Sequence, residues 1–313
     1  MESTKLPRLS LQRERVNLAI LAIAVAVKPI LAMLVQYPLA YLWGIASPGT
    51  VGSPLYTWCI GSLPLYLVAL PVAYAILRLA ADGPKVERTS LTPWRLLTLL
   101  GLATALSFLA EQVVALALRI FSFLPDGALD SAVSEMALAS PLWMTLLFSV
   151  VLAPLFEELF YRRMLLDRLC RYGTLPAVLS GGLLFGLIHG NLTQLIPATA
   201  VGMLLSYVYL STGRLRYAVL LHAAVNLVGG VLPVEIHRAT LHGASYVVGL
   251  QGIYFGLVGL SFLLMIPAVR WLWLERRILP PVGGMRWREW VSAVLLNPGV
   301  LLMLGALTLL FLL

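Results

Sequence analysis

The sequence predicts an all-α fold, a polytopic transmembrane helix bundle of about eight or nine spans. The chain of 313 residues is 60% hydrophobic and only 12% charged, with a mean hydropathy of +0.91. Soluble domains carry about 25% charged residues, so this composition excludes an ordinary soluble protein. Apolar runs of about 20 residues, the length that crosses a bilayer as a helix, follow one another along the chain. Because little polar sequence remains, we expect residues 1–313 to form a single integral membrane domain.

The expected spans are separated by charged or turn-forming segments. The first run is the least simple, because it stays apolar as far as Ala46 and contains Pro29 and Pro38. It is either one kinked helix or one span followed by an interfacial piece. In chain order, the expected spans cover residues 16–37, 55–77, 94–118, 141–161, 174–190, 194–211, 217–234, 246–269 and 290–313.

The basic residues predict the orientation of the chain. If the N-terminus is cytoplasmic and every run crosses once, all of the 22 Lys and Arg residues fall in cytoplasmic segments except Lys28, Arg119 and Arg238. This asymmetry follows the positive-inside rule. Residues 1–15 are then a cytoplasmic basic tail, and we expect a multi-pass protein of a prokaryotic cytoplasmic membrane. Since the net charge of +8 is loop charge of this kind, we expect the lipid bilayer as a partner and no nucleic acid.

Two adjacent glutamates, Glu157 and Glu158, lie in one of the most apolar stretches of the chain, between Met144 and Leu166. An ionisable residue inside a bilayer is costly, which makes it a functional candidate. Adjacent helical residues diverge by about 100°, so the two carboxylates face different surroundings. We expect Glu158 to be ionised and paired with Arg162, four residues further on, and Glu157 to face a wet cavity as a general base. The alternative is a helix end that emerges into the cytoplasm with ordinary interfacial charge.

Two histidines and an asparagine lie in later expected spans. His189 ends an apolar helix and would orient a water or carry a proton, with Phe185 one turn before it; the alternative is a structural histidine. His222 and Asn226 are four residues apart and offer two side-chain donors to one small volume, as an oxyanion hole requires. Their alternative role is hydrogen bonding between membrane helices.

Three other ionisable residues receive no catalytic role. His237 and His242 fall in an outer loop after the seventh expected span, where we expect a structural or solvent-exposed role. Glu111 lies in the third expected span, where it either lines the cavity or bonds a neighbouring helix. The sequence does not decide between these two roles.

The polar residues of the expected spans group into three motifs, in the order Glu157-Glu158-x-x-x-Arg162, Phe185-x-x-x-His189 and His222-x-x-x-Asn226. This pattern resembles the CPBP family, which comprises CAAX-processing proteases and bacteriocin-processing enzymes, also called Abi proteins. The resemblance covers residues 141–232 and implies a CAAX-protease-like catalytic core there. It implies an intramembrane endopeptidase that hydrolyses a peptide bond near the membrane-associated end of a protein substrate. An example is the bond whose cleavage removes the C-terminal tripeptide from a prenylated CAAX protein.

The resemblance also implies a role for each motif residue. Glu157 would activate the attacking water with help from His189, and Glu158 and Arg162 would hold the electrostatics of the site. The donor pair of the third motif would stabilise the tetrahedral oxyanion. The expected partner is a membrane-associated or lipid-modified polypeptide.

Metal dependence is a separate question. Glu157, His189 and His222 would supply three ligands if the enzyme used Zn²⁺. The chain lacks His-Glu-x-x-His, the usual zinc helix. Asn226 is a poor zinc ligand, and Arg162 already neutralises one carboxylate. We therefore expect metal-free hydrolysis without a cofactor.

Two functions of other classes compete with proteolysis. One is a non-catalytic membrane scaffold or immunity factor of the same fold, whose site would usually lack a motif residue, and none is missing here. The other is a proton-coupled transporter, in which intramembrane Glu and His form a relay. Transporters commonly carry inverted repeats, and the sequence shows no such internal symmetry.

Overall fold

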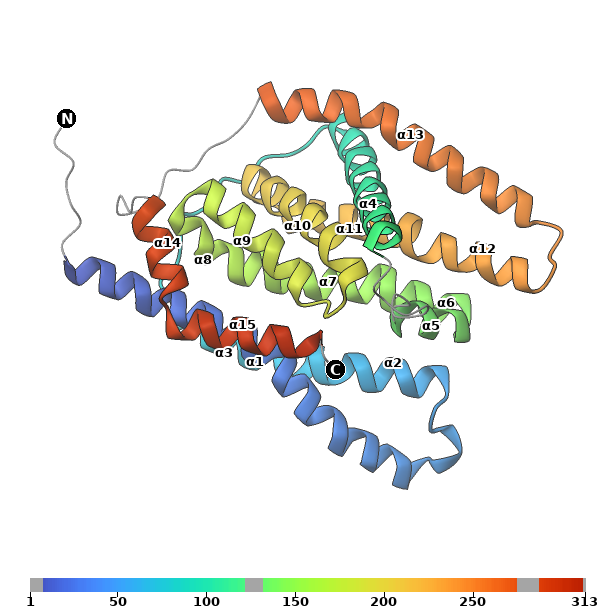
Figure 1. Ribbon diagram of the computed structural model, residues 1–313, viewed down its shortest axis with the longest axis horizontal. Coiled ribbons are helices and arrows are strands. Elements are labelled where there is room, and N and C mark those ends of the chain that lie inside the picture. The colour runs from blue at the N-terminus through green and yellow to red at the C-terminus, as the bar shows by residue number, and fades with distance from the viewer. Residues whose placement is uncertain (1–7, 122–131, 275–286, 312–313) are drawn as a thin grey trace. The chain divides into compact units, whose positions relative to one another are not determined.

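The computed structural model describes residues 8–121, 132–274 and 287–311, and all the regular structure within them is helical (Figure 1). The predicted all-α membrane bundle is confirmed, and the chain is an integral membrane protein. Residues 1–7 of the expected basic tail lie outside the described ranges, and Arg8 already begins the first helix. Seven of the described helical stretches are long and apolar enough to cross a membrane, namely Leu11–Ala46, Pro54–Leu77, Pro93–Ile120, Leu142–Tyr172, Leu192–Thr212, Leu215–Leu241 and Val247–Leu274.

Two expected spans form shorter helices. The run at 174–190 becomes α9 (Thr174–Leu187), whose 14 residues rise only about 21 Å, less than the thickness of a hydrocarbon core. The run at 290–313 divides into α14 (Trp287–Leu295) and α15 (Pro298–Leu310), because Pro298 cannot donate a backbone hydrogen bond to the preceding turn. Asn297 caps α15: its side-chain oxygen accepts a hydrogen bond from the backbone N–H of Gly299, in the first turn of that helix.

The described chain forms two compact units, each assembled from segments distant in sequence. The first unit contains residues 1–85, 160–181 and 278–313. Its α1 (Arg8–Ala46) runs as one continuous helix through Pro29 and Pro38. It packs against α3 (Leu70–Leu77) and α15. The division into units does not test the expectation of a single integral domain, which stays a prediction.

The second unit contains residues 86–159 and 182–277. Its α4 (Pro93–Phe121) packs against α10 (Leu192–Thr212), α11 (Leu215–Val225) and α13 (Val247–Leu274), and Figure 1 shows α4 between the other three helices. Apolar side chains from all four helices form its core. The most deeply buried members are Leu99, Ala103, Leu205, Val208, Ala218, Leu221 and Ala268.

Three helices of the bundle contain a π-helical turn that ends just before a proline. Proline lacks the N–H of a helical hydrogen bond and its ring clashes with the carbonyl four residues earlier. A wider π turn accommodates this defect, and such turns often occur at functional sites. The turns and their prolines are η2 (Pro64–Ala69) with Pro71, η3 (Leu146–Leu152) with Pro154, and η6 (Asn226–Val231) with Pro233. A fourth π turn, η4 (Leu159–Leu166), follows Glu158 without a proline after it.

The remaining described helices are short. They are η1 (Pro48–Thr50), α2 (Pro54–Leu63), α5 (Ala132–Ala139), α6 (Leu142–Thr145), α7 (Ala153–Glu158), α8 (Asp167–Leu169), η5 (Cys170–Tyr172) and α12 (Leu232–Leu241).

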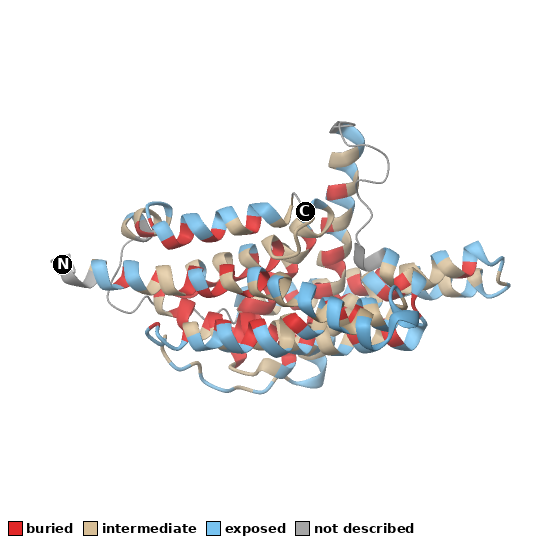
Figure 2. Cartoon of the chain, turned by 90° about the horizontal axis from the view of Figure 1, so that it is seen from below, coloured by how far each residue is buried: buried red, intermediate tan, exposed pale blue. Residues whose placement is uncertain are grey.

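Exposed residues cover much of the helical surface (Figure 2), and many of them are large and apolar, including Leu34, Val248 and Leu263. In water, such surface would be unfavourable. It is the surface that a protein surrounded by lipid presents.

Close packing against α10 positions the C-terminal part of α9. A Cβ atom on Gly186 would lie 2.6 Å from the carbonyl oxygen of Leu195, and one on Gly202 would lie 3.0 Å from the ring of Phe185. Small residues let the two helices approach to this distance. The segment that follows α9 turns at Gly190, whose backbone φ is 66°. Glycine adopts this conformation without strain. These contacts set the places of Phe185 and His189.

Candidate active site

The two glutamates occupy the last positions of α7, and the helix continues as η4. Glu158 is completely buried, while the Glu157 side chain is 19% exposed. The predicted difference between the two environments is therefore present. A fully buried carboxylate requires a partner, because an uncompensated charge in an apolar interior is very costly.

His222, on α11, lies against both glutamates. Its Nδ1 is 3.0 Å from Oε1 of Glu158, and its Nε2 is 4.0 Å from Oε2 of Glu157. An ionised carboxylate can only accept a hydrogen bond, so Nδ1 carries the proton that is donated to Glu158. The second ring nitrogen then faces Glu157 across a gap that is too long for a direct hydrogen bond.

The carboxylate of Glu157 is only partly engaged. Its Oε2 is buried and makes no hydrogen bond with any residue that the structure describes. A buried oxygen in this condition has its acceptor capacity available to a water molecule or a substrate. The side chain thus has the position and the acceptor capacity of a base.

Phe185 connects the second and third motifs. Its ring meets His189 edge-on at 5.2 Å between centroids, and meets His222 edge-on at 5.4 Å. The Nδ1 atom of His189 lies 2.7 Å from the backbone carbonyl of Phe185, and because a carbonyl only accepts, Nδ1 donates and Nε2 is left as the proton-accepting nitrogen. Both histidines therefore contact the same aromatic ring.

Asn226 begins the π turn η6. Its Nδ2 donates to the backbone carbonyl of Ser149 at 2.8 Å, and Ser149 lies in the π turn η3. The contact joins the helix of the third motif to the helix of the glutamates. Ser149 was not singled out from the sequence, since it participates through a backbone atom and no side-chain pattern reports that.

Comparison with protein-family models matches residues 139–228 to the Rce1-like family, described as type II CAAX prenyl endopeptidase Rce1-like. All six predicted site residues fall inside this segment. Residues 139–228, called the CAAX protease segment below, are therefore similar to the CAAX protease family. The resemblance predicted from the three motifs is confirmed. No curated protein and no solved structure matches the chain.

Arg162 of the CAAX protease segment lies in η4, four residues after Glu158 on the same continuous helix, and is completely buried. The expected pairing of Glu158 with Arg162 stays a prediction. The contact between Glu158 and His222 was not expected from the sequence, which treated these residues as parts of separate motifs.

Possible metal ligands do not gather in the part of the chain that the structure describes. Within the described residues, no group of three His, Cys, Asp or Glu side chains is placed to hold a metal ion. The expected ligand set of a metal-dependent enzyme, Glu157, His189 and His222, stays a prediction. Nδ1 of His222 is also occupied by Glu158. Metal-free hydrolysis stays a prediction.

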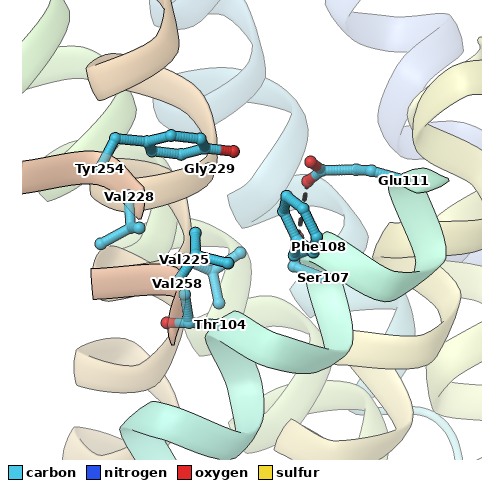
Figure 3. Close-up of a pocket in the computed structure, with 9 residues that line it drawn as sticks. All are labelled: Thr104, Ser107, Phe108, Glu111, Val225, Val228, Gly229, Tyr254 and Val258. Carbon is cyan, nitrogen blue, oxygen red and sulfur yellow. Dashed lines mark hydrogen bonds between the residues drawn. The ribbon is translucent and has the colours of Figure 1, made fainter. Parts of the chain in front are cut away.

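Glu111 lines a small pocket of about 10 Å³ between α4, α13 and η6, room for about one water molecule (Figure 3). Its carboxylate accepts a hydrogen bond from Ser107 on its own helix at 2.9 Å. Gly229 faces it, and Tyr254 lies across the pocket in Figure 3. The pocket contains none of the six site residues, so Glu111 lines a cavity separate from the motif residues.

The two remaining histidines lie outside the CAAX protease segment. His237 is on the exposed side of α12, and His242 follows that helix and is also exposed. Neither approaches the site residues in sequence or by a described contact.

Proposed function

We propose that the chain is an intramembrane endopeptidase that hydrolyses a peptide bond near the membrane-associated end of a polypeptide. One observation carries the proposal: the buried, unbonded Oε2 of Glu157 faces Nε2 of His222 at 4.0 Å. This pair of atoms, a proton acceptor and a ring nitrogen, lies inside the segment that matches CAAX prenyl endopeptidases. General-base hydrolysis needs these two kinds of group on either side of the reacting atoms.

Glu157 is the proposed general base. It takes a proton from a water molecule while the water oxygen bonds to the carbonyl carbon of the scissile peptide. The proton then passes to the leaving amine as the carbon–nitrogen bond breaks. His189 assists this transfer, because its Nδ1 is committed to the Phe185 carbonyl and Nε2 is the nitrogen that accepts a proton.

His222 and Asn226 are the proposed oxyanion donors. Glu158 accepts a hydrogen bond from Nδ1 and fixes the imidazole ring, so that Nε2, when it carries a proton, donates to the oxyanion. Asn226 uses one amide hydrogen on the carbonyl of Ser149 and has a second to donate. Loss of one oxyanion donor typically costs about 10²–10³ in kcat.

The proposed substrate is a membrane-associated or lipid-modified polypeptide, in keeping with the family description, which names prenyl endopeptidases. The proposed reaction uses no cofactor. The proposed setting is a prokaryotic cytoplasmic membrane. The one-sided distribution of Lys and Arg supports an N-terminus in the cytoplasm.

Cleavage of a farnesylated peptide tests the proposal. The purified protein in lipid nanodiscs is given a fluorogenic peptide with a farnesyl-cysteine three residues before its C-terminus. The wild type should release the tripeptide, while Glu157→Gln, which keeps the shape and removes the base, should not. Glu235→Gln is the matched control, because Glu235 pairs with Arg238 outside the motifs and its loss should leave the rate unchanged.

The result also separates the competing functions. Cleavage by Glu157→Gln at the wild-type rate refutes Glu157 as the base. No cleavage in any variant is the result expected of a scaffold, an immunity factor or a transporter, and also of an enzyme that rejects the farnesylated probe. A comparison of membrane proteomes from cells carrying the wild type or Glu157→Gln, searched for uncleaved termini, would then identify a natural substrate if the enzyme rejects the farnesylated probe.

A further inference from the structure

A second cavity lies at the N-terminal end of α4, away from all six site residues in sequence. Its volume is about 80 Å³, several times the space that one water molecule needs. It is the more polar of the two cavities described, and no acidic residue is among the described residues that line it. Its polar and aromatic walls include Thr89, Ser90, Arg95, Tyr207, Ser211 and Trp271.

Ser211 contributes a hydroxyl group without a partner. The residue is 8% exposed, and its Oγ is buried and makes no hydrogen bond within the described parts of the chain. Nearby hydroxyls of α10 behave differently: Ser206 donates to the Gly202 carbonyl at 2.8 Å and Thr212 donates to the Val208 carbonyl at 2.7 Å. Because Ser211 lines the cavity, its unbonded hydroxyl is a candidate donor to a ligand oxygen there.

Arg95 supplies a cation in the first turn of α4. Its guanidinium carbon lies 5.2 Å from the ring centre of Trp271, a cation–π contact that holds the group against the cavity wall. Its backbone amide bonds to the Thr92 side chain at 3.2 Å, which marks the capped N-terminus of the helix. A helix N-terminus with an adjacent guanidinium favours an anion, and guanidinium groups match phosphate geometry in particular.

Backbone contacts between distant segments hold the cavity walls in place. The Thr89 amide donates to the Thr212 carbonyl at 2.8 Å, and the Thr89 hydroxyl donates to the Ser211 carbonyl at 3.2 Å. Arg214 donates from Nε to the Thr89 carbonyl at 3.0 Å. At Gly213, φ is 61° and a Cβ atom would lie 2.6 Å from the Glu87 carbonyl, so only glycine fits this crossing. The cavity is therefore formed before a ligand arrives.

We propose that this cavity binds a phosphate group, supplied either by the headgroup of an anionic phospholipid or by free phosphate. Arg95, the end of α4 and the Ser211 hydroxyl act together as its donors. Basic residues are frequent at this end of the second unit, with Arg88, Arg214, Arg216 and Arg270 in the adjoining segments. Basic pockets between membrane helices on the cytoplasmic side are typical headgroup sites.

Ligand-dependent stability of the full-length protein tests the proposal. Thermal unfolding is followed in nanodiscs of phosphatidylcholine alone, in nanodiscs with added phosphatidylglycerol, and in phosphatidylcholine nanodiscs with inorganic phosphate. A ligand that binds only the folded state raises the unfolding temperature. Arg95→Gln should weaken the apparent affinity by roughly tenfold or more, and Ser211→Ala by about fivefold, from the typical strengths of charged and neutral hydrogen bonds.

Two substitutions serve as controls. Arg216→Gln removes an exposed cation from the same end of the unit without touching the cavity wall, and Ser206→Ala removes a buried hydroxyl of α10 that is already bonded. Both should keep the wild-type response. A response to phosphatidylglycerol that depends on Arg95 and Ser211 supports a lipid headgroup, and the same dependence with inorganic phosphate supports a free anion.

No response in either arm overturns the proposal. An equal loss of response in Arg95→Gln and Arg216→Gln would do the same, since it would reveal only general surface charge. If Arg95→Gln does not fold, the comparison of Ser211→Ala with Ser206→Ala still decides. None of these measurements depends on proteolytic activity, so the proposal stands or falls apart from the proposed function.

Discussion

Nδ1 of His222 lies 3.0 Å from Oε1 of Glu158, and both side chains are buried. The contact joins the first and third motifs, whose residues are 64 positions apart in the chain. It orients the imidazole so that Nε2 faces Glu157. The second glutamate of the pair therefore contacts His222 directly, and the first stays the proposed base.

Glu158→Ala should destabilise the protein by about 1–3 kcal/mol, because it leaves the buried Nδ1–H of His222 without its hydrogen-bond acceptor. Glu158→Gln keeps an oxygen acceptor for Nδ1 and should cost less. Unfolding by denaturant in mixed micelles measures both. If the two substitutions cost the same, the hydrogen bond to Nδ1 does not stabilise the fold.

His222→Ala should lower kcat for the farnesylated peptide by about 10²–10³, the usual effect of losing an oxyanion donor. His237→Ala is the control, since His237 is exposed on α12 and should be neutral. Steady-state kinetics of the two variants are compared at equal amounts of folded protein. A change in KM without a change in kcat would assign His222 to substrate binding instead.

Asn226→Leu should both slow the reaction and reduce stability. The lost bond to the Ser149 carbonyl leaves a buried acceptor unsatisfied, which costs about 1–3 kcal/mol. Asn17→Ala removes another bond between side chain and backbone, in which the Ala81 amide donates to Oδ1 of Asn17 in the first unit. That control should retain activity. Full activity in Asn226→Leu would confine Asn226 to a structural role.

Phe185→Leu should lower kcat by loosening both histidines, because each loses an edge-to-face contact worth about 0.5–1.5 kcal/mol. Phe262→Leu removes a similar ring pair, with Phe108, on a helix that carries no site residue. The two variants should lose similar stability but differ in rate. Equal rates would show that the Phe185 ring does not position the histidines.

Chelation should leave the rate unchanged in protein shown by elemental analysis to contain no metal. The described side chains do not assemble a three-ligand set, and Glu158 already holds His222. Activity is measured before and after treatment with a strong chelator, and again with stoichiometric zinc. Loss of activity in the chelator and recovery with zinc would overturn the metal-free mechanism.

Much of the fold follows from composition alone. Apolar runs of bilayer length predict helices, because a backbone in lipid must satisfy its own hydrogen bonds. All nine expected runs contain helices, although α9 and α15 are shorter than a full span. Periodicity did not reveal the early end of α9, because Ile188 is as apolar as the helix before it and the turn depends on the backbone of Gly190.

By itself, the sequence determined that the chain lies in a membrane, that Glu157 and Glu158 have different environments, and that three motifs share one region. Helix periodicity and the cost of burying charge are local properties, so a sequence reports them directly. Only the tertiary structure decided the partners, pairing Glu158 with His222 and Asn226 with the carbonyl of Ser149, 77 residues away. Such contacts depend on how helices distant in sequence pack, on the closeness that Gly186 and Gly202 permit, and on π turns that redirect side chains.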